Sequence, residues 1–187
     1  MGTIRDFKYK KIKKFLTKKE VELLTTYSII KHRANSDSFD TPLGLSNNLD
    51  TMYYGDAVME SVMLNKQNVI EKETGLKLLP TYAFWRMYTY AANLPKHRDR
   101  SACEISVTVM LGSDGTEWPI SMNDVKVNLK SGDAVVYLGC EVKHGREDFK
   151  GDWQSQLFMH YVDKNGKYTE WEGDKRSIYG TTKRTRK

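Results

Sequence analysis

Apolar and polar positions divide the chain into a helical front and a strand-rich remainder. In residues 17–33 the apolar side chains recur at the three- and four-residue spacing of an amphipathic helix. Thr17 followed by Glu20 is a capping-box pattern, which predicts that the helix starts at Thr17. The side chains expected to face the core are Val21, Leu24, Tyr27 and Ile30. Residues 35–48, rich in serine, aspartate and asparagine, predict a loop.

A second helix is predicted over residues 56–75. Val58, Val62 and Val69 are its expected inward positions. Gly75 is well placed to end it, because glycine readily adopts the left-handed backbone conformation that closes many helices. Neither predicted helix carries a chemical motif.

Strands dominate the rest of the chain. Residues 105–110 and 125–129 alternate between apolar and polar side chains, which is typical of half-buried strands. Further strands are predicted over residues 82–90, 133–139 and 154–162. Because turns rather than helices separate these short strands, the pattern predicts a mainly β fold with N-terminal helices, its strands forming an antiparallel sandwich or barrel.

Length and cysteine usage narrow the class of protein. A chain of 187 residues suits one domain with a substantial core, and no internal repeat divides it. Cys103 and Cys140 make no disulfide framework, which favours a reducing compartment. The chain opens with no secretory leader, and no segment approaches the roughly 20 apolar residues that cross a bilayer. We therefore expect a soluble, cytoplasmic protein with no membrane partner.

The formal charge of +6 is concentrated near the two ends of the chain. The basic residues concerned are Lys8, Lys10, Lys11, Lys13, Lys14, Lys18, Lys19, Lys175, Arg176, Lys183, Arg184, Arg186 and Lys187. Such segments either hold the phosphates of a nucleic acid or serve as solvated tails, and the sequence leaves both readings open. Residues 181–187 are predicted to form a disordered basic tail.

The candidate chemistry lies in His97-Arg98-Asp99 and, 47 positions after His97, in His144. Two imidazoles and one carboxylate are the set that binds a non-haem Fe(II) by one face and leaves its other positions open. His97 and Asp99 are two apart, so in an extended segment their side chains point the same way. A His-x-Asp pair is also common by chance, and two solvated polar residues are the alternative.

These residues stand in a wider pattern that resembles the Fe(II)- and 2-oxoglutarate-dependent oxygenases. The pattern is Tyr88-Thr-Tyr-Ala-Ala-Asn-Leu-Pro-Lys-His97-Arg-Asp99, then Gly132-Asp133, then His144 before a last core strand. It is most similar to the prolyl-4-hydroxylase-like branch. The stretches 137–146 and 156–161 are also similar to small members found in marine phages and cyanobacteria.

The resemblance implies a fold and a reaction. The fold is a double-stranded β-helix, or jelly roll, with its core over residues 78–163, supporting helices over 17–75 and one domain over 1–180. The implied activity is a dioxygenase that hydroxylates a C–H bond of a peptide or protein, a prolyl residue included, or of a small molecule. Fe(II) and 2-oxoglutarate are the implied cofactors, with ascorbate as reductant, and the cytoplasm of a phage-infected bacterium is an implied location.

The resemblance also implies roles for single residues. His97, Asp99 and His144 become the metal ligands, and because related halogenases lack the carboxylate, Asp99 favours hydroxylation. Tyr88, nine positions before His97, matches a tyrosine that binds the co-substrate carboxylate in prolyl-hydroxylase-like enzymes. The family's cation about ten positions after the distal histidine is replaced by Gln154, and the candidate substitutes are Arg146, Lys150 and Arg86.

A few further residues are weaker candidates for the functional site. His160 and Trp118 are expected to be packed in the core or at its rim, while Glu104 and Arg100 are either partners of the metal ligands or solvated charges. Residues 35–55 and 112–124 are the loops expected to select the substrate. The alternative function is a non-catalytic jelly roll that binds nucleic acid or protein through its basic termini.

Overall fold

The computed structural model describes residues 2–36 and 50–182. Residues 183–187 of the predicted tail 181–187 and residues 37–48 of the predicted loop 35–48 lie outside these residues. Within the described part, the helical elements are α1 Ile4–Phe7, α2 Lys18–Ser36, α3 Ala57–Thr74, η1 Ser101–Cys103 and η2 Thr169–Lys175. The strands are β1 Tyr9–Ile12, β2 Thr51–Tyr54, β3 Leu78–Thr89, β4 Leu94–His97, β5 Ile105–Ser113, β6 Ile120–Met122, β7 Val125–Val127, β8 Ala134–Leu138, β9 His144–Arg146 and β10 Trp153–Asp163.

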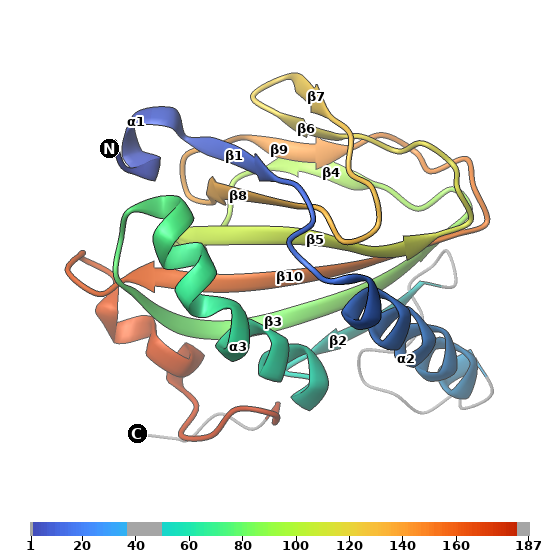
Figure 1. Ribbon diagram of the computed structural model, residues 1–187, viewed down its shortest axis with the longest axis horizontal. Coiled ribbons are helices and arrows are strands. Elements are labelled where there is room, and N and C mark those ends of the chain that lie inside the picture. Colours follow the sequence, from blue (N-terminus) through green and yellow to red (C-terminus); the bar gives the residue numbers. More distant parts are fainter. Residues whose placement is uncertain (1, 37–49, 183–187) are drawn as a thin grey trace.

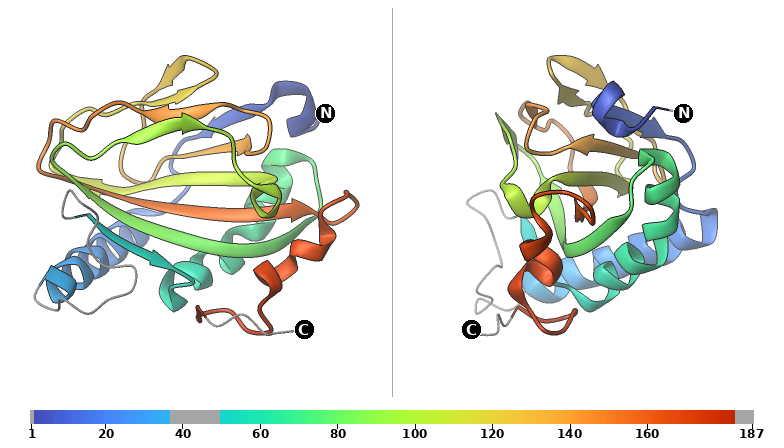
Figure 2. Two further views of the ribbon diagram at one scale, coloured as in Figure 1. Left: turned by 180° about the vertical axis from the view of Figure 1, so that it is seen from behind. Right: turned by 90° about the vertical axis from the view of Figure 1, so that its left-hand side faces the viewer.

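In the described residues the strands form two antiparallel sheets. The larger has the order β1-β8-β5-β10-β3-β2, and the smaller the order β4-β9-β6-β7. Helices α2 and α3 lie in front of the larger sheet in Figure 1 and behind it in the reversed view of Figure 2, so they cover one of its faces. The smaller sheet lies on the opposite side (Figure 2).

Alternation along the central strands separates a packing face from a cavity face. On β3, Trp85 is fully buried in the main hydrophobic cluster beside helical residues such as Met63. The alternate residues of these strands, such as Phe84 on β3 and Phe158 on β10, point instead into the space between the sheets. Because successive side chains of a strand face opposite ways, one hydrophobic pattern builds the core while the other positions remain available for chemistry.

The helix ends agree with the sequence pattern, and some inward positions do not. The Thr17 hydroxyl accepts from the Glu20 amide and the Glu20 carboxylate accepts from the Thr17 amide, which confirms the capping box. However, Ile30 is 63% exposed and was wrongly predicted to face the core. The prediction fails because apolar positions spaced by three residues drift around the axis of a helix with about 3.6 residues per turn, so Ile30 turns away from the sheet while Val21 and Leu24 pack against the core.

The second helix shows the same division. Asp56 caps its start by accepting from the Met59 amide, and Gly75 ends it with φ of 70°, as predicted. The buried face consists of Met59, Met63 and Ile70. Val58 and Val69 were predicted to face inward, but they are exposed. The helix is rotated so that the face carrying Met59 and Met63 packs against the sheet.

The basic N-terminal residues are part of the folded sheet and not a free tail. Strand β1 pairs with β8, and Lys10, one of its residues, forms an ion pair with Glu73. Lys8 pairs with Glu141 and Lys11 with Asp133. Much of the positive charge at this end is thereby neutralised. No helix in the described ranges is long and apolar enough to span a membrane.

Candidate metal centre

Strand pairing brings together the two histidines that stand 47 positions apart in the sequence. His97 ends β4 and His144 begins β9, and the two residues are partners in the antiparallel register of these strands. Asp99 follows β4, and its amide donates to the Gly139 carbonyl at 2.9 Å, which turns the carboxylate toward the imidazoles. The structure therefore assembles the three residues at one end of the smaller sheet.

The spacing of their ligand atoms suits one small cation. Asp99 Oδ1 lies 3.3 Å from His97 Nε2 and 3.5 Å from His144 Nε2, and the ligand atoms of the three residues all lie within 4.8 Å of one another. Atoms bound about 2.1 Å from one ion, at right angles to each other, stand about 3 Å apart. Small movements would close the set on an ion, so the residues fit a 2-His-1-carboxylate centre.

Both imidazoles are held in the orientation that a metal requires. His97 Nδ1 lies 2.8 Å from the Pro95 carbonyl, and His144 Nδ1 lies 2.9 Å from the Val142 carbonyl. A carbonyl can only accept, so Nδ1 carries a proton in each ring; Nε2 is the atom that donates to Asp99 in the metal-free protein and that, once deprotonated, presents its lone pair to a metal. Both Nε2 atoms face Asp99. A sequence shows no signal for this orientation, which depends on the main-chain path two residues before each histidine.

Electrostatics keeps the carboxylate ionised. Burial by itself raises the pKa of Asp99, but the hydrogen bonds from His144 and His97 outweigh it, so the pKa lies well below the usual range. Asp99 in turn raises the pKa of His97. The site therefore offers a negative charge between two nitrogen ligands, which is attractive to a divalent cation.

A cavity of about 240 Å³ opens beside the three residues. Its walls are largely aromatic, and it is lined by Tyr82, Phe84, Arg86, Tyr88, Leu94, His97, Asp99, Tyr137, His144, Phe158 and His160. Tyr137, fully buried, places its hydroxyl 3.4 Å from His144 Nε2. A small organic molecule could thus enter next to the candidate metal position.

Arg146 is a buried guanidinium with no acidic partner among the described residues. It is 5% exposed, its Nη1 donates to the Trp118 carbonyl, and its Nε has no hydrogen-bond partner in the described ranges. With the Gln156 amide in the orientation that satisfies its neighbours, the amide oxygen accepts from Arg146 Nη2 at 3.3 Å and from Gln154 Nε2 at 2.8 Å. Burial lowers the pKa of Arg146 to about 10, as expected for a cation whose charge is not compensated.

Arg146 lies near Gln154, the residue that replaces the family's carboxylate-binding cation. Gln154 and Gln156 belong to β10, whereas Arg146 reaches their side chains from β9. Arg146 on β9 therefore lies close to Gln154 on β10, the position at which the family pattern has a basic residue and this chain does not. Arg146 forms no surface salt bridge with the neighbouring Glu147 or Asp148, because its side chain is buried and these carboxylates face exposed lysines.

Tyr88 and Arg86 share the cavity with the candidate metal ligands. Tyr88 is 1% exposed, and burial raises the pKa of its hydroxyl, a shift that the nearby charges of Arg86 and Arg146 oppose. The Arg86 guanidinium lies 4.0 Å from the centre of the Tyr88 ring. Unlike Arg146, Arg86 is paired with a carboxylate, since its Nε and Nη2 both donate to Asp50, at 2.6 and 2.5 Å.

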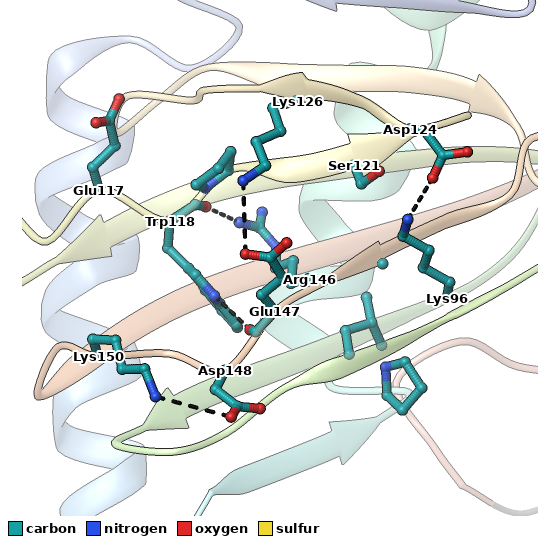
Figure 3. A pocket seen from close by; sticks show the side chains of 14 residues that line it. Lys96, Glu117, Trp118, Ser121, Asp124, Lys126, Arg146, Glu147, Asp148 and Lys150 are labelled. Carbon is teal, nitrogen blue, oxygen red and sulfur yellow. Dashed lines mark hydrogen bonds and ion pairs between the residues drawn. The ribbon is translucent and has the colours of Figure 1, made fainter.

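Lys150 lies outside this cavity. Its side chain is 69% exposed and faces Asp148 at 3.9 Å. Figure 3 shows it at one end of a separate groove of about 560 Å³ on the smaller sheet, which Arg146 also lines and where Lys96 and Lys126 are likewise paired with acidic residues. The structure does not bring Lys150 to the metal ligands, because the loop after β9 carries it to the surface.

The weaker candidates have structural partners. Glu104 binds the Arg5 guanidinium and the Asp163 amide, so it is neither a solvated charge nor a partner of the metal ligands. Arg100 pairs with Asp174 at 2.9 Å. Trp118 is packed at the end of the barrel as expected, 8% exposed. His160 is buried and hydrogen-bonded to Ser106, a residue that the sequence gave no reason to single out.

Comparisons with known proteins give no match by sequence and clear matches by structure. No family model matches the chain, and no curated protein matches it. The viral collagen prolyl hydroxylase of Paramecium Bursaria Chlorella virus-1, solved in complex with 2OG, has a TM-score of 0.61 at 15% identity over 82% of this chain and 94% of its own. A prolyl-4-hydroxylase of Pseudomonas putida has a TM-score of 0.62 at 16% identity over 87% and 98%.

Proteins with other names share the same fold. HygX of Streptomyces hygroscopicus, solved with nickel and 2-oxoglutarate bound, has a TM-score of 0.63 at 11% identity over 84% of this chain and 83% of its own. Such identities establish architecture and not activity. The predicted fold class is confirmed: the chain has the mainly β, double-stranded β-helix fold of the 2-oxoglutarate and Fe(II) oxygenases, prolyl hydroxylases among them.

Proposed function

We propose that this protein is an Fe(II)- and 2-oxoglutarate-dependent dioxygenase that hydroxylates a C–H bond. The observation that carries the proposal is the convergence of His97 Nε2, Asp99 Oδ1 and His144 Nε2, with both imidazoles fixed in the ligating orientation. The carbonyls of Pro95 and Val142 hold both Nδ1 atoms away from the centre, which leaves both Nε2 atoms facing the position that a metal would take.

In this proposal His97, Asp99 and His144 hold Fe(II). The bound iron, with 2-oxoglutarate and oxygen, supplies the oxidation that ends in succinate, carbon dioxide and a hydroxylated product, with ascorbate as an auxiliary reductant. The chain contributes ligand geometry, a fixed negative charge and a cavity whose aromatic walls limit water. The carboxylate at Asp99 favours hydroxylation over halogenation.

Arg146 is our candidate for binding the distal carboxylate of 2-oxoglutarate. A buried guanidinium without a counter-ion is costly, and an anion that enters beside it removes that cost. Its free Nε can make a further charge-assisted hydrogen bond. Tyr88 is proposed as the hydroxyl partner, since it lines the cavity and feels the charge of Arg146. Arg86 is a weaker candidate because Asp50 already engages it.

The uncharged residues that line the cavity restrict the chemical character of the substrate. Tyr82, Phe84 and Phe158 carry no charge, so the group that approaches the iron is expected to be uncharged and largely apolar. A prolyl or other aliphatic side chain of a peptide satisfies this, and so does a small molecule. The kinship with small phage and cyanobacterial enzymes, and the location that it implies, remain predictions.

The alternative function, a non-catalytic module that binds nucleic acid or protein through basic termini, has less support. Lys8, Lys10 and Lys11, three of the basic residues near the N-terminus, are already paired with carboxylates of this chain. The C-terminal basic residues 183–187 lie outside the described residues. No observation favours this function over the oxygenase.

The proposal predicts a spectroscopic signal. Anaerobic addition of Fe(II) and then 2-oxoglutarate to the purified protein should produce the weak visible charge-transfer band of a chelated keto acid. The band should be absent in Asp99→Ala, because the remaining two nitrogens bind the ion too weakly and no longer offset its charge. Tight Fe(II) binding without the band would contradict the keto-acid assignment, and absence of Fe(II) binding would contradict the metal centre.

A further inference from the structure

The second oxygen of Asp99 is bound by a residue that the proposed reaction does not use. Ser106, on β5 and fully buried, places its Oγ 2.7 Å from Asp99 Oδ2. The same Oγ lies 3.1 Å from the Cys103 carbonyl. A hydroxyl has one proton, and the ionised carboxylate is both the nearer and the stronger acceptor. Ser106 therefore donates to Asp99 Oδ2.

A buried histidine donates the second hydrogen bond to the Ser106 hydroxyl. His160 faces Ser106 across the β5–β10 register, with its Nδ1 2.9 Å from the Ser106 Oγ. Burial lowers the pKa of His160 to about 4, so the ring is neutral at physiological pH. Because the hydroxyl proton is committed to Asp99, His160 Nδ1 must be the donor to Oγ. Two hydrogen bonds thus run in one direction, from His160 through Ser106 to Asp99.

Gly139 closes the same side of the carboxylate. A Cβ atom on Gly139 would lie 2.5 Å from Asp99 Oδ2, 2.8 Å from the Ser106 Oγ and 2.1 Å from the Cys103 carbonyl oxygen. These separations are shorter than real Cβ contacts, so the main chain of Gly139 is packed directly against the carboxylate. Asp99 Oδ2 is enclosed, whereas Oδ1 faces the two imidazoles.

We propose that Ser106, held by His160, is a positioning residue that makes Asp99 bind a metal through Oδ1 alone. This inference rests on the proposed function. A carboxylate free to rotate could offer both oxygens and occupy one more coordination position, one that a bidentate co-substrate needs. The enclosed hydrogen bond restricts Asp99 to a single oxygen and holds it at a constant orientation before any metal arrives.

The test uses Co(II) as a probe, because the intensity of its visible bands falls as its coordination number rises. Ser106→Ala should weaken Co(II) binding about 10- to 100-fold, the usual cost of losing a partner of a metal ligand. It should also change the intensity of the bands at saturation. Ser106→Thr keeps the hydroxyl and should stay within about threefold of the wild-type affinity.

The matched control is Ser155→Ala. Ser155 is also a fully buried serine of the larger sheet, but its hydroxyl bonds Trp85 and Ser28 and not a candidate ligand. This variant should bind Co(II) with the wild-type affinity and spectrum. Thermal unfolding of each apo-protein separates a loss of folding from a loss of metal binding.

Several outcomes would overturn the inference. One is a folded Ser106→Ala with the wild-type affinity and spectrum. Another is an equal loss in Ser106→Ala and Ser106→Thr, which would assign the effect to packing and not to the hydroxyl. If the wild-type protein itself binds neither Co(II) nor Fe(II), the proposed function fails first, and the inference fails with it.

Discussion

His97→Ala and His144→Ala are each expected to weaken Fe(II) binding by more than about a hundredfold, since loss of a mere partner of a ligand already costs about 10- to 100-fold. Each change removes one of the three ligand atoms, and two atoms cannot occupy one face of the ion. Turnover of 2-oxoglutarate should disappear with the metal. Anaerobic titration calorimetry measures the first effect and succinate formation the second.

His97→Ala is the cleaner variant for separating binding from folding. The His97 side chain is 41% exposed, whereas that of His144 is 3% exposed and touches Tyr137. Removing His144 is therefore expected to cost stability, about 1–3 kcal/mol for the buried partners left unsatisfied. His32→Ala is the matched control, because His32 on α2 bonds Thr51 and does not line the cavity. Full metal affinity in both histidine variants would remove the metal assignment.

Arg146→Met is expected to have opposite effects on co-substrate binding and on stability. Without the guanidinium, the affinity for 2-oxoglutarate should fall about 30- to 4,000-fold, since a hydrogen-bonded ion pair in a buried site is worth roughly 2–5 kcal/mol. At the same time the apo-protein should become more stable, by about 1–4 kcal/mol, because a methionine of similar length removes a buried and uncompensated charge. Fe(II) binding should be unchanged, since Arg146 contacts none of the three ligands.

Paired measurements distinguish this prediction from a general packing effect. Thermal unfolding with and without 2-oxoglutarate should show a higher apo transition in Arg146→Met and no added stabilisation by the keto acid. Lys150→Met serves as the control and should leave both quantities unchanged, because the Lys150 side chain is exposed and faces Asp148 at the surface. If Lys150→Met weakened 2-oxoglutarate binding and Arg146→Met did not, the assignment of the carboxylate site would be reversed.

The sequence by itself was sufficient for the features that depend on local chemistry. The cap at Thr17 and the stop at Gly75 follow from short-range hydrogen bonds and backbone preference, and they occur as predicted. The β-rich class and several of its strands follow from the alternation of side chains. The residue types of the candidate metal centre were also readable, because a His-x-Asp pair and a distant histidine form a recognisable ligand set.

Only the tertiary structure decided which side chains meet. The β4–β9 register places His97 opposite His144, and β9 rather than β10 provides the buried cation, Arg146. Ser106, on β5, and Gly139, in the turn after β8, enclose Asp99 although no local pattern connects them to it. Local preferences act over a few residues, whereas burial, strand register and uncompensated charge are properties of contacts between distant segments. For that reason the sequence determined the elements and the ligand types, and the fold determined the orientation, partners and charge of each group in the site.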